Sequence, residues 1–423
     1  MLQKVADLLK EQAFSVLAFS IFGMMFVMRP VTWLPTTILL FCLLGLLLSR
    51  QFRMSFSSAI QRNDLVWIVV PFVVWFIASL VVGFWHWGGG QSTHFQRMRF
   101  AFFFLSLGAL ALIVHARSRD AFVMGLLVAS VCAALNVWHG WTVPVEYYPR
   151  IKGTTNHPVH FGNFAALLMV LLVTIAALGT FYKTRTRWWL MMGASLALVA
   201  AVASYSRSVF LIFLCLLPVF VVAESDFLHR WFLRLIYSLA LVFVFVVIST
   251  PSVQESLRIK AAVSDVEMME SSNYQGSMGS RLVMWRAAWS MFKAHPVVGV
   301  GPNKFREIFI QKMETAEVPR ADAEHNQPHN DLLNAAATGG LIKLVAYLGI
   351  MIGPFVFFRK IFKSLHASTA SRIWPLIGMQ VVVAFVLTGL TNSNFDLQIY
   401  STTYAVLVCV LAKLSVVSEA PTA

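Results

Sequence analysis

The sequence predicts an all-α polytopic membrane protein with about twelve transmembrane helices and one long, partly helical insert between helices nine and ten. Hydrophobic residues make up 58% of the 423 residues and charged residues only 12%, and the mean hydropathy is +0.72. A single water-soluble core could not bury so much apolar surface. Apolar runs of about 18 residues, the length a helix needs to cross a bilayer, recur along the chain. One polar stretch, residues 251–334, interrupts them.

These runs divide the chain into residues 1–250 with helices one to nine, the insert 251–334, and residues 335–423 with helices ten to twelve. Two boundaries fall at short interruptions: Arg29-Pro30 needs a very tight hairpin, and the charged run 204–208 divides one long apolar stretch. The predicted spans are residues 13–28, 31–48, 65–84, 98–115, 121–139, 161–181, 188–203, 208–223, 232–250, 335–358, 373–391 and 398–416.

The distribution of Lys and Arg predicts the orientation, because these residues concentrate in cytoplasmic loops. They are abundant in one set of alternate loops, and this places both termini in the cytoplasm and the insert on the opposite side. These cytoplasmic Lys and Arg, which meet anionic lipid headgroups, account for much of the net charge of +14 without nucleic acid. The first apolar segment lacks a convincing cleavage site and is expected to be retained. The loops on the insert's side hold only Arg29, Arg97, Arg99, Arg150, Lys152 and Arg207.

The insert is too long for an idle connection and is expected to be functional. Residues 281–296 predict a helix ended by Pro296, and residues 298–303 predict a turn. The acidic and then Ser- and Gly-rich residues 263–280 predict a mobile lid or loop. The expected apolar stripes are Leu282, Trp285, Trp289 and Phe292 on the first helix, and Phe305, Ile308, Phe309 and Met313 on a second.

His329 is the main candidate for chemistry, because it lies where the insert re-enters the membrane. Pro328 suits the first turn of a helix, and the helix dipole would keep a neighbouring imidazole neutral and able to accept a proton. The alternative is that His329 merely caps a membrane helix. His325 and His329 have the spacing of a helical metal pair, but Pro328 lies between them and only Glu324 or Asp331 could add a ligand, so no metal site is expected.

Cations on the same side form the second part of the candidate site. Arg207 lies between two apolar stretches and is expected to face a polar cavity, unless it reaches the interface instead. Arg281 and Arg286 are five positions apart, about 140° around a helix, so both reach one anion only if the helix begins between them. Otherwise they belong to a solvated helix face. Guanidinium groups bind phosphate bidentately, which suits Arg207 and Arg281 for holding a diphosphate.

Further polar residues are assigned to substrate binding. The segment 156–160 precedes a span and either lines the same cavity or caps the helix. No Walker motif is present, and two glycines, Gly299 and Gly301, are too few to cradle a nucleotide. Cys42, Cys132, Cys215 and Cys409 all lie in predicted helices, so no disulfide framework or thiolate site is expected. The substrate-binding candidates are Arg286, His325, Asn330, Asn156 and His157.

Four segments, in order and on one side of the membrane, resemble the motifs of the O-antigen ligase and polymerase superfamily of bacterial inner membranes. The similarity is strongest from about residue 150 to 345. The resemblance implies metal-independent transfer of a glycan from an undecaprenyl-diphosphate carrier, without a cofactor, with Arg207, Arg281 and His329 as its essential residues. The segments are Ser204-Tyr-Ser-Arg-Ser208, Gly279-Ser-Arg-Leu-Val-Met-Trp285, His295-Pro-Val-Val-Gly-Val-Gly-Pro302, and His329-Asn-Asp-Leu-Leu with Thr338-Gly-Gly-Leu341.

Within this superfamily the single long insert near the C-terminus favours a ligase, which moves O-antigen onto lipid A–core oligosaccharide at the periplasmic face of the inner membrane. An O-antigen polymerase, which uses the same donor, is the alternative; such enzymes tend to have a second large outer loop. A protein O-oligosaccharyltransferase usually has a further C-terminal region. A secondary transporter or a lipid-linked glycan binding protein is the alternative of another class, but a transporter predicts symmetric halves and ionisable residues inside its spans. Here Lys343 is the main residue of that kind.

Overall fold

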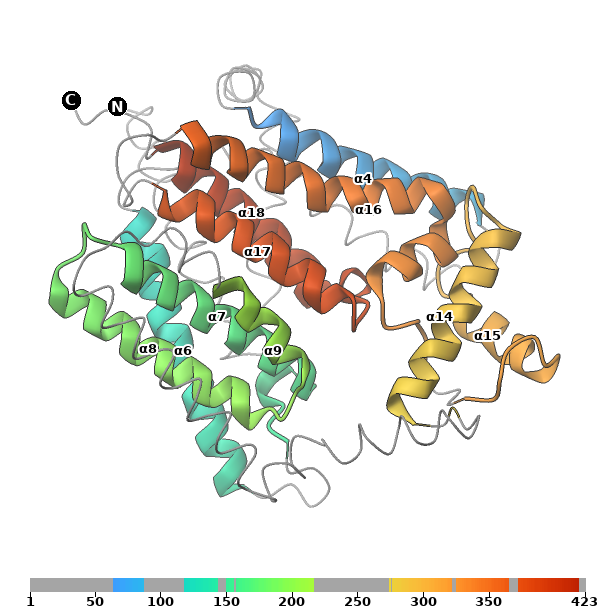
Figure 1. Ribbon diagram of the computed structural model, residues 1–423, viewed down its shortest axis with the longest axis horizontal. Coiled ribbons are helices and arrows are strands. Elements are labelled where there is room, and N and C mark those ends of the chain that lie inside the picture. The colour runs from blue at the N-terminus through green and yellow to red at the C-terminus, as the bar shows by residue number, and fades with distance from the viewer. Residues whose placement is uncertain are drawn as a thin grey trace, which may run out of the picture.

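The computed structural model describes residues 64–86, 118–143, 150–155, 157–216, 274, 276–321, 325–364 and 372–417. All the regular elements in these ranges are helices, as the sequence predicts (Figure 1). Three are short 3-10 helices: η2 (Gly153–Thr155), η3 (Leu214–Leu216) and η4 (Asn394–Asp396). The α-helices are α4 (Val66–Trp85), α6 (Ser118–Thr142), α7 (Pro158–Leu178), α8 (Thr184–Ala203), α9 (Ser208–Phe213), α14 (Ser277–Ala294), α15 (Phe305–Glu314), α16 (Asp331–Ser364), α17 (Ile373–Gly389) and α18 (Gln398–Val417).

Among the described residues, six helices are long and apolar enough to cross a membrane: α4, α6, α7, α8, α16 and α18. The apolar helix α17 is slightly shorter. These seven helices match seven of the predicted spans within a few residues, which makes the chain a multi-pass membrane protein. The predicted spans 13–28, 31–48, 98–115 and 232–250, most of 208–223, and the hairpin at Arg29-Pro30 lie outside the described residues.

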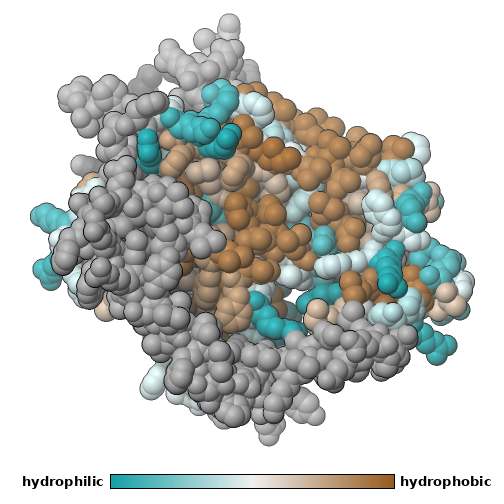
Figure 2. Space-filling view, viewed as in Figure 1, coloured by the Kyte–Doolittle hydropathy of each residue, from teal (hydrophilic) through white to brown (hydrophobic). Residues whose placement is uncertain are grey.

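The helices pack around α7, whose membrane-spanning window is entirely buried. It packs against α6, α8, α9 and α17, and α17 in turn packs against α16 and α18. α4 lies along α16 (Figure 1). Figure 2 shows a broad hydrophobic surface over the described helices, with hydrophilic residues at both of its sides, one of them toward α14 and α15. α4 and α16 also carry exposed apolar side chains: Val70, Val74, Ile77 and Val81 on α4, and Leu341, Val345, Leu348 and Ile352 on α16.

Helix α16 is broken at Gly340, and the turn that follows α14 forms hydrogen bonds with the backbone on both sides of the break. Gly340 has φ 61° and ψ −157°, a conformation almost restricted to glycine. The break leaves backbone groups without helical partners, which is costly inside a membrane protein. The turn satisfies them: Leu341 N–H donates to the carbonyl of Pro296 at 2.7 Å, and Val300 N–H donates to that of Ala337 at 2.9 Å. Two of the sequence motifs, 295–302 and 338–341, are therefore one structural unit that fastens the insert to α16.

Replacing Gly340 with alanine is expected to destabilise this junction. A side chain there would overlap the backbone of Val297, and the left-handed backbone adds strain of about 1–3 kcal/mol. Gly349 lies in the same helix, and a Cβ there would meet only Pro71 at an ordinary 3.6 Å. In detergent, Gly340→Ala should lower the thermal unfolding temperature by several degrees and Gly349→Ala should not. Equal melting temperatures for the two variants would show that the break at Gly340 does not need glycine.

The two insert helices form a small second core beside the ends of α4 and α16 (Figure 1). The stripe predicted on α14 is wrong, because Val283, Met284, Ala287, Ala288 and Met291 form its buried face. Small side chains let α14 approach α16 closely, whereas Trp289 remains 51% exposed. The face predicted for α15 is confirmed. Phe305 and Phe309 are buried, and Ile308 and Met313 pack against the core.

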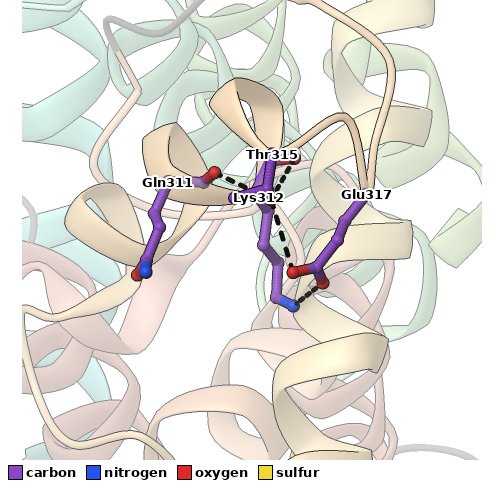
Figure 3. Close-up of polar contacts among 4 residues, drawn as sticks. All are labelled: Gln311, Lys312, Thr315 and Glu317. Atoms are coloured by element: carbon purple, nitrogen blue, oxygen red, sulfur yellow. Dashed lines mark hydrogen bonds and ion pairs between the residues drawn. The ribbon is translucent and has the colours of Figure 1, made fainter.

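Helix α15 ends in a Schellman motif. Ala316 is left-handed with φ 56°, Glu317 N–H donates to the carbonyl of Lys312 at 2.9 Å, and Ala316 N–H donates to that of Met313 at 3.2 Å. The ammonium of Lys312 also pairs with the carboxylate of Glu317 across this end (Figure 3). The motif ends α15 and satisfies its last carbonyl groups.

Candidate functional site

His329 lies just outside α16 and not within its first turn. The helix begins at Asp331, so the prediction that Pro328 opens it is wrong. His329 has φ 51°, a left-handed conformation that is uncommon for a residue other than glycine. Asn330 then caps the helix, because its Oδ1 accepts the N–H of Leu333 at 3.1 Å. In this conformation the ring of His329 contacts Asn392, in the segment after α17, and His325.

The imidazole of His329 is held at both nitrogens. Nδ1 lies 3.4 Å from Oδ1 of Asn392, and Nε2 lies 3.1 Å from Nδ1 of His325. The indole Nε1–H of Trp285, on α14, donates to the carbonyl of Pro328 at 3.0 Å. Helix α14 thus contacts the loop that carries His329 through Trp285, one of the residues of the predicted apolar stripe.

The surroundings of His329 keep its ring neutral. Burial, followed by the neighbouring His325 and Arg281, lowers the pKa of His329 to about 4, although the hydrogen bond with Asn392 opposes the shift. A neutral imidazole can accept a proton near pH 7, but a low pKa makes it a weak base. An anion bound beside Arg281 would offset the positive charge and raise the pKa again. The site can therefore gain basicity when an anionic substrate binds.

Arg281 is the arginine of α14 that acts on His329. Both Arg281 and Arg286 lie inside α14, which begins at Ser277, so the condition under which both could reach one anion is not met. Arg281 is half-buried and its charge lowers the pKa of His329. Arg286 is exposed. The geometry favours Arg281 over Arg286 as the partner of a group bound at His329.

A second histidine pair lies at the start of α7. The rings of His157 and His160 are 4.7 Å apart, and His157 is close enough to His329 to contribute to its low pKa. Burial and then Arg150 lower the pKa of His157 itself. His157 occupies the N-cap position without a side-chain capping bond. Asn156, the other candidate of this segment, lies outside the described residues.

Arg207 begins α9 at the same end of the bundle. The predicted break at 204–208 is confirmed, since α8 ends at Ala203 and α9 begins at Ser208. The hydroxyl of Ser208 donates to Oδ1 of Asn163 at 2.6 Å, and Nδ2 of Asn163 donates to the hydroxyl of Tyr400 at 3.1 Å. Tyr400 lies 3.3 Å from Nδ1 of His160. A buried polar chain thus connects the Arg207 turn with the histidine pair. Arg207 itself is half-buried.

Sequence reasoning missed the segment 391–396, which joins α17 to α18. In addition to Asn392, it supplies Asp396, whose Oδ2 accepts a hydrogen bond from Nδ2 of Asn334 at 3.0 Å. Phe395 N–H donates to Oδ1 of buried Asp331 at 3.1 Å. The signal available in the sequence was a run of six residues, with two asparagines and an aspartate, between two apolar stretches on the insert's side of the membrane. A purely connecting turn would not require so many buried polar groups.

The described residues contain no group of three or more His, Cys, Asp or Glu arranged to hold a metal ion. Glu324, one of the two possible third ligands, lies outside them. His325 uses Nδ1 to contact His329 directly. The described cysteines Cys132, Cys215 and Cys409 are free. Lys343 lies over the ring of Trp75 at 5.6 Å, a cation–π contact with α4.

Comparison with known proteins gives a similar protein and a matching family. A protein of Haemophilus influenzae, described as uncharacterized, is 22% identical over 205 residues, which are 48% of this chain and 51% of that protein. The chain thus spans about half the length of this relative. The sequence model of the family described as O-antigen ligase matches residues 192–348, from within α8 to within α16, and the match includes Arg207, Arg281 and His329. Residues 192–348 are therefore similar to the O-antigen ligase family.

Proposed function

We propose that the protein is an O-antigen ligase of the bacterial inner membrane. It transfers O-antigen polysaccharide from undecaprenyl diphosphate to a hydroxyl of lipid A–core oligosaccharide, with inversion at the anomeric carbon. Both termini lie in the cytoplasm and the site faces the periplasm. The observation that carries the proposal is a half-buried histidine, His329, whose ring contacts Asn392 and His325 and whose pKa is lowered in part by the charge of Arg281, within the segment that matches the family.

In the reaction, Nε2 of His329 takes the proton of the acceptor hydroxyl as its oxygen attacks the anomeric carbon. The bond from that carbon to the diphosphate oxygen breaks, and the electron pair leaves with the diphosphate. Arg281 and Arg207 stabilise the negative charge that develops on this leaving group, so no general acid is required. His157 and His160 line the same end of the bundle and suit contacts with sugar hydroxyls.

This mechanism uses no metal and no ATP, because the diphosphate ester already stores the energy and arginines neutralise its charge. The test uses purified protein in detergent with undecaprenyl-diphosphate O-antigen and lipid A–core. The rate should be unchanged in excess chelator and without nucleotide. A rate that falls on chelation and recovers with a divalent ion would contradict the arginine mechanism.

The same assay separates ligase from polymerase. A ligase joins the glycan to lipid A–core, whereas a polymerase lengthens the glycan while it remains on undecaprenyl diphosphate. Lengthening without lipid A–core, and no transfer when it is present, would identify the chain as the polymerase. Binding of the donor without either product would favour a binding protein or transporter.

A further inference from the structure

The segment 391–396 between α17 and α18 contains several buried polar side chains. Asn392 is 6% exposed, and Ser393 and Asn394 are completely buried. Burying asparagine side chains costs free energy unless their amides are hydrogen-bonded. Here the two amides form a continuous chain that ends at His329, the residue proposed as the base.

This chain of hydrogen bonds begins within α17 and ends at the imidazole of His329. The hydroxyl of Thr388 donates to the carbonyl oxygen of Ala384 at 2.8 Å. Nδ2 of Asn394 donates to the Thr388 hydroxyl oxygen at 2.9 Å, and Nδ2 of Asn392 donates to Oδ1 of Asn394 at 3.0 Å. Oδ1 of Asn392 then faces Nδ1 of His329 at 3.4 Å. Each amide uses its nitrogen on one side and its oxygen on the other.

The direction of this chain is determined by its far end. The carbonyl oxygen of Ala384 can only accept a hydrogen bond, so the Thr388 hydroxyl donates its hydrogen there. The Thr388 oxygen therefore accepts the hydrogen bond from Nδ2 of Asn394. Every amide along the chain must then present its oxygen toward His329. An amide oxygen can only accept, so Nδ1 of His329 must carry the hydrogen. The lone pair of the neutral ring is consequently on Nε2.

We propose that Asn392 is a positioning residue that holds His329 in the Nδ1–H tautomer, so that Nε2 faces the acceptor hydroxyl as the base. The inference rests on the proposed function. Without substrate, Nε2 of His329 contacts Nδ1 of His325 at 3.1 Å. The acceptor hydroxyl replaces His325 at Nε2 when it binds. When Nε2 accepts the hydroxyl proton, the Nδ1–H continues to donate its hydrogen bond to Oδ1 of Asn392. This amide oxygen stabilises the positive charge of the ring.

The segment that carries Asn392 is also tied to the helix that follows His329. Phe395 N–H donates to Asp331 at 3.1 Å, and Asn334 donates to Asp396 at 3.0 Å. The segment with Asn392 is thus hydrogen-bonded to the first turn of α16, and His329 directly precedes this turn in the sequence. Asn392 therefore fixes the Nδ1 side of the ring, and His325 contacts the Nε2 side.

Three variants test the inference with the purified protein and the ligase assay. Asn392→Leu keeps the approximate size but removes the acceptor, and should lower kcat by about 10–100-fold with little change in KM. Asn392→Asp keeps an acceptor for Nδ1, and should recover much of kcat. Thr391→Val is the matched control, because it removes a hydrogen bond of the same segment, from the Thr391 hydroxyl to the carbonyl of Thr388 at 3.2 Å, without touching the chain. It should behave as the parent protein.

The pH profile gives a readout that a merely structural role would not change. A carboxylate at position 392 favours the charged imidazolium and raises the pKa of His329 by about 1–3 units. The base must be neutral, so activity is lost as pH falls through that pKa. The acidic limb of kcat/KM should therefore move to higher pH in Asn392→Asp and stay in place in Thr391→Val. A shift in Asn392→Asp alone supports the inference even if Asn392→Leu does not fold.

The inference is overturned if Asn392→Leu retains the parent kcat, or if Asn392→Asp folds but shows no displaced acidic limb. Equal losses in Asn392→Leu and Thr391→Val would also overturn it, because the effect would then belong to the loop. His329→Ala is measured in parallel. If that variant keeps its activity, the proposed base is wrong. If it is inactive while Asn392→Leu is unaffected, only the role of Asn392 is wrong.

Discussion

His329→Ala is expected to lower the rate of glycan transfer by about 10²–10⁴-fold, the usual contribution of a positioned general base. The acceptor hydroxyl would have to lose its proton to water during attack. Because the diphosphate is held by other residues, KM for the donor should change little. The measurement is kcat and KM with undecaprenyl-diphosphate O-antigen and lipid A–core, and in cells the loss of surface O-antigen with an intact lipid-linked donor.

The matched variant is His325→Ala, which removes the ring that contacts Nε2 of His329 and should be milder. Burial and cationic neighbours place the pKa of His329 near 4. The base is neutral above this value, so kcat/KM of the parent protein should stay level from pH 8 to about pH 5 and fall only as the pH approaches the pKa. Near-normal transfer by His329→Ala would contradict its role, as would an acidic limb that survives unchanged in that variant.

Arg281→Gln is expected to lower kcat by about 10²–10³-fold, because it removes fixed positive charge from the position where the leaving diphosphate becomes more negative. Arg281→Lys keeps the charge but loses the planar fork that binds two oxygens, so it should recover only part of the rate. The control is Arg286→Gln, five positions along the same helix and exposed. It should resemble the parent protein.

Arg207→Lys, measured in the same assay, distinguishes a diphosphate-binding role of Arg207 from a role as an interfacial anchor. A strong loss of activity indicates that its fork binds the diphosphate, whereas full activity would reduce Arg207 to an interfacial anchor. If Arg286→Gln were as damaging as Arg281→Gln, the assignment based on α14 would be wrong. Loss of folded protein in any variant is checked by its thermal unfolding temperature.

The sequence alone was sufficient for the membrane helices that the structure describes. Apolar runs of the required length predicted seven of them, including the boundary at 204–208, because a bilayer leaves few alternatives to a continuous helix. The same reasoning failed on α14. Its large apolar residues suggested a stripe through Trp289, but the buried face contains Ala287 and Ala288, because close approach to another helix favours small side chains.

The candidate residues His329, Arg207 and Arg281 could be selected from their chemistry and motifs, since charged and titratable groups are rare in an apolar chain. Only the tertiary structure decided how they combine. It moved the start of α16 to Asp331, separated Arg281 from Arg286, and brought Asn392 to His329 across 63 positions of sequence. The physical reason is that composition and periodicity describe local preferences, whereas a tautomer, a lowered pKa and a filled helix break depend on groups that meet only after the chain has folded.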